Sequence, residues 1–334
     1  MTRTFAVIAL AALLLCGCSG GEPAGDEDAF RVGMVFDVGG KGDKSFNASA
    51  YRGLLHAADD FGIVHTEFEP GQDADREAGL RKLARAGYDV IIGVGFLFSD
   101  AIKTVAVDYP ETQFICVDYD VRPGEELPDN FSGLIFREEE GSFLVGALAA
   151  MFTETGRIGF IGGMDVPLIH RFEAGYVAGA QHIDPKVSVT VAYAGTTPQA
   201  FADPARGKEL ALLQYGRGVD VIYHASGSTG NGVIEAAKEA GRYAIGVDSN
   251  QNYMAPGHML TSMVKRVDNA VYEAIRAVLE GEHMSGIMRF GLEEDGVAYA
   301  YDQHNQDLLT DEMIARVEEI EAKIIAGEIE VPAE

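Results

Sequence analysis

Short apolar runs alternate with amphipathic segments along most of this chain, and this alternation limits the possible folds more than any other feature. Tyr88–Gly95 and Gln113–Asp118 are typical of the runs, because apolar and β-branched residues dominate each of them. Ser45–Phe61 is typical of the segments between them, with apolar side chains recurring at the spacing of one helix face. Buried strands separated by helices form parallel sheets that are covered on both faces. We therefore predict an α/β fold.

The pattern occurs twice, once before and once after the middle of the chain. The first part is predicted to hold strands at 31–37, 64–68, 88–95 and 113–118, and helices at 45–61, 73–86 and 99–109. The second part is predicted to hold strands at 131–136, 157–162, 187–193, 219–223, 243–248 and 259–264, helices at 138–152, 169–183, 204–215, 230–240, 267–281 and 311–326, and a short β region around 288–290 and 297–300. Two such parts indicate two doubly wound domains. Ser45 is expected to be the N-cap of the first helix.

The N-terminus is typical of an exported protein. Phe5–Leu15 is an apolar run of eleven residues, which is too short to span a bilayer and is typical of a signal-peptide core. Gly17 followed by Cys18 resembles the bacterial lipobox, in which the cysteine is diacylated and becomes the first residue; an ordinary secretory signal is the alternative. We expect a signal peptide at 1–17, a lipid on Cys18, a flexible acidic tether at 18–29, and a place in the bacterial cell envelope, anchored to the membrane and facing the periplasm or the exterior.

Charge and cysteine content exclude several functions. The 26 basic and 52 acidic side chains give a net charge of −26, so binding to nucleic acids or to anionic lipids is not expected. If Cys16 leaves with the signal peptide and Cys18 is lipidated, only Cys116 remains, inside a predicted buried strand. A lone buried cysteine is expected to be part of the core. No Cys and His spacing indicates a zinc site, and we predict no metal and no cofactor.

Sequence motifs for nucleotide binding or catalysis are incomplete. In the glycine-rich loop before the first helix, Asp43 precedes Lys44, where a P-loop requires glycine. The glycines from Gly227 to Gly232 have the dinucleotide-binding spacing in reverse. The acidic run Glu138–Glu140 favours a helix N-terminus and needs no catalytic role. With no GxSxG, HExxH or Cys/His signature, we predict that the protein is not an enzyme.

The strand ends carry the side chains that best indicate a ligand site. In open α/β sheets, ligands bind at the carboxyl ends of the strands. Carboxylates there suit a neutral ligand with several hydroxyl groups, whereas the alternative is that each one caps the following helix. Phe46 and Phe172, near these ends, offer surfaces for a planar ring or are simply part of the core. The charged residues at the strand ends are Asp37, Asp118, Asp248 and Lys265.

Several blocks, in order along the chain, resemble the basic membrane protein family, which includes the purine nucleoside receptor lipoproteins of bacteria, the solute-binding subunits of ABC importers. The resemblance runs from about residue 31 to residue 327. The blocks are Val35–Gly40 with Asp43–Asn47, Glu140–Leu144 with Gly146–Ala150, Gly159–Asp165, Arg171–Tyr176, Asp220–Tyr223, Gly246–Gln251 and Ser262–Asp268.

The resemblance implies a type I periplasmic-binding-protein fold, with two α/β domains joined by three crossovers and the ligand between them. It implies one domain at 30–135 plus 250–263, another at 136–249 plus 264–327, and a tail at 328–334. It also implies that Phe46 and Phe172 stack on a nucleobase, that Asp118 and Asn47 bind its edge, that Asp248 and Lys265 hold the ribose hydroxyls, that Asp37 supports the site, and that Gly227 lets the backbone approach the sugar. Asn250 stands where the family usually has Asp, and this difference would bear on ligand preference if the position touched the ligand.

We therefore expect a lipid-anchored, monomeric receptor that binds a nucleoside, with a purine favoured, and delivers it to an ABC permease. Three alternatives stay open. The same fold could bind a sugar or another small polar solute. The protein could instead be a nucleoside-acting hydrolase, or a surface adhesin or sensor, for which the sequence offers no motif.

Overall fold

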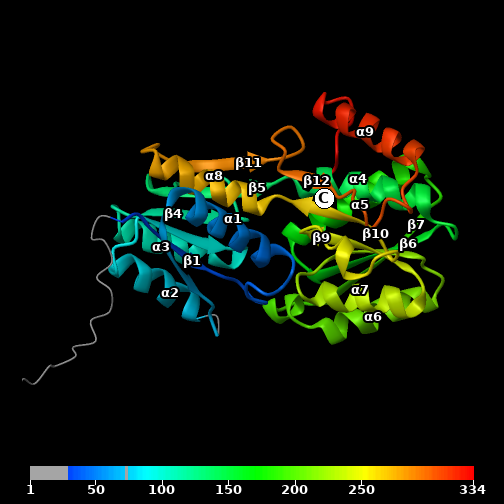
Figure 1. Ribbon diagram of the computed structural model, residues 1–334, viewed down its shortest axis with the longest axis horizontal. Helices are drawn as coiled ribbons and strands as arrows, with labels where there is room; N and C mark the ends of the chain where they lie inside the picture. The colour runs from blue at the N-terminus through cyan, green and yellow to red at the C-terminus, as the bar shows by residue number, and fades with distance from the viewer. Residues whose placement is uncertain (1–28, 72–73) are drawn as a thin grey trace, which may run out of the picture.

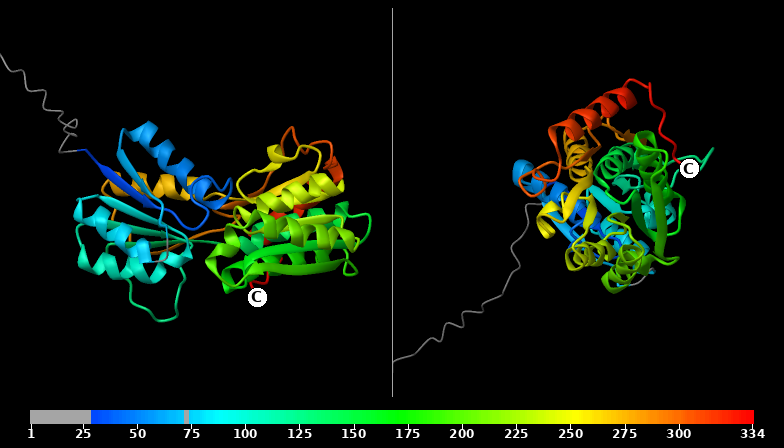
Figure 2. Two further views of the ribbon diagram at one scale, coloured as in Figure 1. Left: turned by 90° about the horizontal axis from the view of Figure 1, so that it is seen from below. Right: turned by 90° about the vertical axis from the view of Figure 1, so that its right-hand side faces the viewer.

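The computed structural model describes residues 29–71 and 74–334. The predicted signal peptide, Cys18 and all of the predicted tether except its last residue lie outside the described residues. The described chain forms two lobes that lie side by side along the long axis of the molecule (Figures 1 and 2).

A parallel sheet forms the centre of the first lobe, with strand order β11-β5-β4-β3-β1-β2. Its last contributions come from late in the chain, as the orange α8 and β11 beside the blue and cyan elements of Figure 1 show. The elements of this lobe are β1 (Arg31–Val35), α1 (Phe46–Phe61), β2 (Val64–Phe68), α2 (Ala74–Arg85), β3 (Val90–Val94), the 3-10 turn η1 (Phe96–Phe98), α3 (Ser99–Asp108), β4 (Gln113–Val117), β5 (Phe131–Phe136), α8 (Val267–Leu279) and β11 (Gly286–Phe290).

The second lobe has the same plan, with strand order β12-β10-β9-β8-β6-β7 and one antiparallel strand, β12, at its edge. Its elements are α4 (Glu138–Phe152), β6 (Arg157–Met164), α5 (Pro167–Ile183), β7 (Ser188–Gly195), η2 (Pro198–Phe201), α6 (Pro204–Gly216), β8 (Val221–Ala225), α7 (Thr229–Ala240), β9 (Tyr243–Asp248), η3 (Asn252–Met254), β10 (Met259–Lys265), β12 (Val297–Tyr299) and α9 (Asp311–Ile325).

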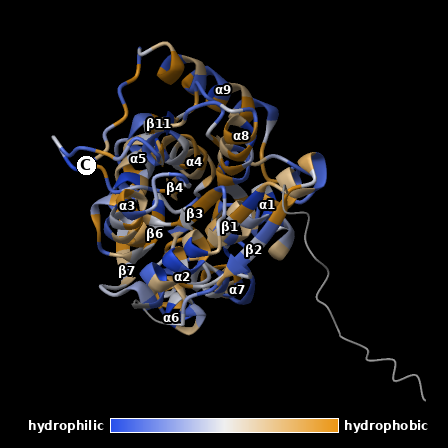
Figure 3. Ribbon diagram, turned by 90° about the vertical axis from the view of Figure 1, so that its left-hand side faces the viewer, coloured by the Kyte–Doolittle hydropathy of each residue, from blue (hydrophilic) through white to orange (hydrophobic). Residues whose placement is uncertain are grey.

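The inner strands of each sheet are buried on both faces because they are apolar at most positions, whereas the edge strands β2, β7 and β11 are partly exposed. In β1, Met34 joins the core formed with α1 and α8, whereas Val35 faces the core formed with α2 and α3. In β6, Phe160 and Ile161 divide in the same way between the α4–α5 side and the α6–α7 side. Figure 3 shows hydrophobic and hydrophilic residues alternating along the helices that surround the sheets. The predicted doubly wound α/β fold is confirmed.

Both lobes share a strand order that fixes where a ligand can bind. Read from β2 and from β7, each sheet runs second, first, third, fourth strand. The order therefore reverses between β1 and β3 in one lobe and between β6 and β8 in the other. Ligands of open α/β sheets bind beside such reversals, at the carboxyl ends of the strands.

Three crossovers join the lobes, as predicted, but they divide the chain differently from the predicted boundaries. The predicted assignment placed 250–263 with the first domain and 264–327 with the second. Strand pairing corrects this, because β10 lies between β9 and β12 in the second sheet, whereas β11 pairs with β5 in the first. Helix α8 likewise packs on α1. The chain therefore crosses between lobes near residues 137, 266 and 291.

The N-terminus of α1 is capped by a residue other than the predicted one. Ser45 occupies the N-cap position, but its side chain makes no capping hydrogen bond. The Asp43 carboxylate accepts hydrogen bonds from the backbone N–H groups of Ser45, Asn47 and Ala48 instead. The Ser45 hydroxyl is thereby free to donate to Asp248 of the other lobe, at 2.5 Å.

Candidate functional site

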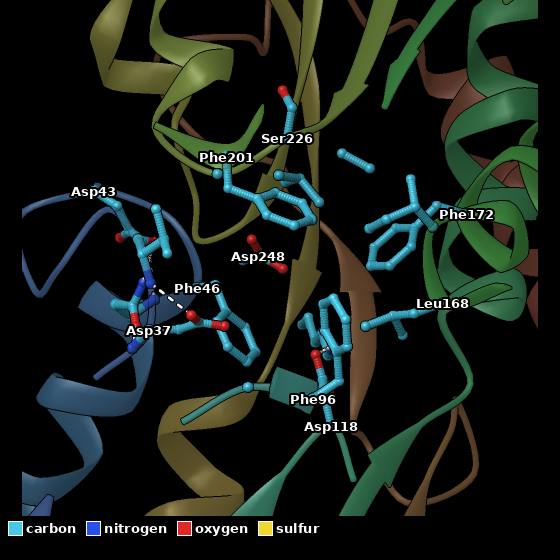
Figure 4. Close-up of a pocket in the computed structure, with 18 residues that line it drawn as sticks. Asp37, Asp43, Phe46, Phe96, Asp118, Leu168, Phe172, Phe201, Ser226 and Asp248 are labelled. Atoms are coloured by element: carbon cyan, nitrogen blue, oxygen red, sulfur yellow. Dashed lines mark hydrogen bonds and ion pairs between the residues drawn. The ribbon is translucent and has the colours of Figure 1, made fainter. Parts of the chain in front are cut away.

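A cavity lies between the lobes at the carboxyl ends of the strands, and Figure 4 shows the side chains that line it. It encloses about 550 Å³ of space outside protein atoms, including solvent at its mouth. All eight residues predicted to bind ligand line it. The lining residues are Asp37, Val38, Asp43, Phe46, Asn47, Gly95, Phe96, Asp118, Leu168, Ile169, Phe172, Phe201, Ala225, Ser226, Gly227, Val247, Asp248 and Lys265.

Lys265, at the end of β10, is the one cation of this lining and is almost completely buried, with 1% exposure. Its Nζ lies 2.6 Å from Asp118 Oδ2 and 3.0 Å from Glu138 Oε1. Burial lowers the pKa of Lys265, but Asp118, Glu138 and Asp248 outweigh that effect and raise it above its ordinary value. The ammonium group is therefore a fixed hydrogen-bond donor at neutral pH.

Two aspartates occupy equivalent places in the two lobes. Asp118 follows β4 and Asp248 ends β9, each the fourth strand in the order of its sheet. Both adopt left-handed backbone conformations, with φ of 57° and 63°, which non-glycine residues rarely do away from turns and functional sites. These conformations place two buried carboxylates on the cavity from opposite lobes.

The surroundings of these two carboxylates make ionisation costly. Burial raises the pKa of Asp118, and Glu138 adds to the effect, whereas Lys265 opposes it. Burial raises the pKa of Asp248 to about 7, although Lys265 and the Ser45 hydroxyl favour its charged form. Asp118 Oδ1 is buried and has no hydrogen-bond partner among the described residues. The cavity thus holds an acceptor that a ligand N–H or O–H could satisfy.

The turn after β1 is built around Asp37 and Asn47. Asn47 Oδ1 accepts from the Asp37 backbone N–H at 3.0 Å, and its Nδ2 donates to Asp43 at 3.0 Å and to the Val38 carbonyl at 3.4 Å. Asp37 pairs with Arg76 at 3.2 Å. Both amide hydrogens of Asn47 are therefore engaged within the protein, and its carbonyl oxygen is the part that still has acceptor capacity.

Aromatic rings form much of the cavity wall. Phe46 begins α1 and Phe172 lies on α5, so the two predicted rings come from different lobes (Figure 4). Their centroids lie 5.1 and 5.6 Å from Lys265 Nζ. The ammonium group and the two rings therefore surround one small volume, which suits a planar ring with a polar edge.

Sequence reasoning missed several lining residues. Phe96 and Phe201 lie in the short turns η1 and η2, and their rings meet across the lobes with centroids 6.4 Å apart. Gly227, which was predicted, has a φ of 56° and leaves no free room for a Cβ, since the Phe201 carbonyl would lie 3.1 Å from it. Phe201 lies just before Asp203 and Pro204, where α6 begins. It is therefore outside any helix or strand whose hydrophobic periodicity could have revealed it.

Asn250, the predicted departure from the family pattern, does not line the cavity. Its Nδ2 donates to Asp302 at 2.6 Å on the surface of the second lobe. A carboxylate at position 250 would face the Asp302 carboxylate instead. The amide is explained by this local pairing and needs no role in ligand selection.

Outside the cavity, the described residues include one buried cysteine and no metal-binding cluster. Cys116 is completely buried, and burial raises the pKa of its thiol. Within 29–71 and 74–334, no cluster of three or more His, Cys, Asp or Glu side chains could hold a metal ion. The cavity itself combines four aspartates and one lysine with apolar rings. That arrangement favours binding of a neutral, hydroxyl-bearing ligand and disfavours an anion.

Comparisons with known proteins agree with this geometry. A family model described as "Bmp: ABC transporter substrate-binding protein PnrA-like" matches residues 30–334. Basic membrane protein A from Borreliella burgdorferi is 33% identical over 337 residues, which cover 100% of this chain and 96% of that protein. An uncharacterized lipoprotein from Pyrococcus abyssi is 35% identical over 298 residues, 86% of this chain and 73% of that one. The crystal structure of an ABC transporter system solute-binding protein from Aeropyrum pernix K1 matches with a TM-score of 0.83 and 32% identity, covering 91% of this chain and 94% of that one.

Proposed function

This chain belongs to the family of PnrA-like ABC transporter substrate-binding proteins, and on that premise we propose that its ligand is a nucleoside, with a purine nucleoside favoured. As a substrate-binding protein, it binds a small ligand and works with permease subunits in the membrane. The nucleoside is held in the interlobe cavity, and closure of the lobes presents it to the permease. No catalytic step is part of this proposal.

The observation that carries the proposal is the buried, unpartnered Oδ1 of Asp118 beside two aromatic rings. A buried acceptor without a partner costs about 1–3 kcal/mol, which a ligand donor would recover. A nucleobase supplies that donor on the edge of a planar ring, and its faces fit between Phe46 and Phe172. A sugar supplies donors but no aromatic face.

Asp248 and Lys265 are the groups proposed to hold the ribose. Because the pKa of Asp248 is raised to about 7 by burial, its carboxyl can accept from or donate to a hydroxyl near neutral pH. The acidic lining also supports a nucleoside over a nucleotide, since a phosphate would lie among carboxylates.

Isothermal calorimetry with inosine, guanosine, adenosine, uridine and ribose tests the proposal. At least one nucleoside should bind in the micromolar range or more tightly, and Asp248→Ala should abolish that binding. Binding of ribose without any nucleoside would support the alternative of a sugar receptor. Release of free base during prolonged incubation would support the alternative of a nucleoside hydrolase.

A lipid anchor at Cys18 is proposed from the sequence, and relatives named as a lipoprotein and a membrane protein support it. Among the helices of 29–71 and 74–334, none combines the length and the apolar character that a bilayer-spanning helix needs. The proposed location is the bacterial cell envelope, on the membrane, facing the periplasm or the exterior.

A further inference from the structure

The first turn of α4 touches all three crossovers between the lobes. It begins directly after the first crossover, where the Arg137 backbone N–H donates to the Phe290 carbonyl at 2.9 Å. Glu140 Oε2 accepts from the Leu292 backbone N–H at 2.8 Å, just after the third crossover. Glu138 reaches Lys265, just before the second. This turn is therefore held from several directions, as a rigid support for a binding group must be.

Glu138 is the residue of this turn that faces the ligand cavity from behind. Its side chain is completely buried. One oxygen lies 3.0 Å from Lys265 Nζ, and the other accepts from Arg171 Nε at 3.0 Å. Arg171 directly precedes Phe172 on α5. Glu138 thus connects the cation of the cavity with the helix that carries one of its aromatic walls, without lining the cavity itself.

Stabilisation of the N-terminus of α4 does not by itself explain why Glu138 is a glutamate. Glu139 and Glu140 also lie in the first turn, where acidic side chains favour the helix N-terminus. Burying a carboxylate is costly unless it is paired. The two ion pairs of Glu138 explain how it can be buried, and the position of Lys265 explains what the burial achieves.

We propose that Glu138 is a positioning residue for ligand binding, which fixes the Lys265 ammonium group toward the cavity and links it to α5 through Arg171. The inference rests on the proposed nucleoside-binding function. Lys265 Nζ donates to Asp118 and forms an ion pair with Glu138 Oε1, so the two carboxylates hold the ammonium group from two sides at the wall of the cavity. Without Glu138, Lys265 would shift further toward Asp118 and donate to Asp118 Oδ1 as well, which is the acceptor proposed for the ligand.

The test compares Glu138→Gln with Glu139→Gln in calorimetric titrations with inosine. Glu139 is a matched control, because it lies in the same turn, is half-buried, and makes no ion pair in the described part of the chain. We expect Glu138→Gln to weaken inosine binding at least tenfold and Glu139→Gln to change it less than threefold. Equal effects of the two substitutions, or wild-type affinity in Glu138→Gln, would overturn the inference.

The pH dependence separates positioning from a general structural role. Lys265 is faced by Asp118 after β4, Asp248 on β9 and Glu138 on α4, so removing the Glu138 charge lowers the pKa of the ammonium group. The ratio of the inosine dissociation constants of Glu138→Gln and wild type, in which the ionisation of the ligand cancels, should therefore increase toward alkaline pH. A ratio that is constant with pH would contradict the inference.

Two further outcomes are informative. If Glu138→Gln does not fold, Glu138→Asp is used instead. This variant keeps the charge but is too short to reach both Lys265 and Arg171, so it should still weaken inosine binding. Wild-type affinity in Glu138→Asp would overturn the inference.

If the wild type binds no nucleoside at all, the proposed function fails. Wild-type binding that is unaffected by Glu138 substitutions contradicts only the positioning role.

Discussion

Asp248 shows how a candidate ligand site can lower the stability of the ligand-free protein. Its backbone has a φ of 63°, and its carboxyl is buried beside other carboxylates. Burial raises its pKa from 3.8 to about 7. In the pH range between these values the folded state keeps a proton that the unfolded state has released, so the free energy of unfolding falls as the pH rises from about 4 to about 7.

The substitution Asp248→Asn should therefore stabilise the ligand-free protein. Each pKa unit corresponds to about 1.4 kcal/mol, so we expect a gain on the order of 1–4 kcal/mol at pH 8 that disappears below about pH 4. Urea unfolding at both pH values measures it. Asp220→Asn is the control, because Asp220 is a buried aspartate that accepts three hydrogen bonds; this variant should be destabilised. A destabilised Asp248→Asn at pH 8 would refute the explanation.

Phe46 is expected to contribute to binding by stacking. Base–aromatic stacking contributes about 1–3 kcal/mol per base, so Phe46→Ala should weaken nucleoside binding by roughly tenfold to a hundredfold. Phe61→Ala is the matched control on the same helix, because Phe61 packs on Tyr272 away from the cavity. Equal affinities of the two variants, measured by calorimetry, would remove Phe46 from the site.

The residues of the candidate site that could be predicted from the sequence are those tied to regular elements. Asp37, Asp118 and Asp248 were visible because each ends an apolar strand, and Phe46 and Phe172 because they lie near these ends. The resemblance to a family added Asn47 and Gly227. Phe96 and Phe201 were not visible, because they lie in single 3-10 turns that have no hydrophobic period. Ser45 occupies the predicted N-cap position, but nothing local shows that Asp43, two residues earlier, takes the capping hydrogen bonds.

At the scale of elements, α4 and α5 pack in close backbone contact in the second lobe. A Cβ built on Gly179 of α5 would lie 2.0 Å from the Phe143 carbonyl oxygen of α4. The two helices can approach at this point only because the side chain is a hydrogen atom. Since α5 carries Arg171 and Phe172, this contact also sets the position of one cavity wall.

The substitution Gly179→Ala should therefore lower the free energy of unfolding by at least about 2 kcal/mol, although alanine favours helix by about 1 kcal/mol. Gly216→Ala is the control at the end of α6, where no atom lies within 4 Å of the added Cβ; we expect no loss there. Urea denaturation of both variants measures the difference. A stable Gly179→Ala would mean that α4 and α5 can separate without cost.

The elements themselves were predictable, but the partners of the last strands were not. Both β10 and β11 were recognised as β segments from their apolar residues. Which sheet each one joins depends on where the chain crosses between the lobes. No distinctive residue types mark the crossovers near residues 266 and 291. The predicted boundaries were wrong there for this reason.

For the whole molecule, the net charge of −26 is mostly unrelated to the ligand. Only four aspartates line the cavity, so most of the 52 acidic side chains lie elsewhere. A protein held at a membrane surface gains solubility from such charge.

The anchor is tested by cell fractionation. With Cys18 intact, the protein expressed in a bacterium should sediment with membranes and be released by detergent. Cys18→Ala should move it to the soluble fraction, because the acyl chains provide the membrane affinity. Cys16→Ala is the control and should behave as the wild type. Membrane retention of Cys18→Ala would exclude this cysteine as the lipid site.

The most direct test of the central claim is a crystal structure of the protein with inosine bound. We predict that the base lies between the rings of Phe46 and Phe172, with one of its N–H or O–H donors within hydrogen-bond distance of Asp118 Oδ1, and that the ribose hydroxyls contact Asp248 and Lys265. A complex in which the cavity holds a sugar or another solute while inosine is excluded would contradict the claim.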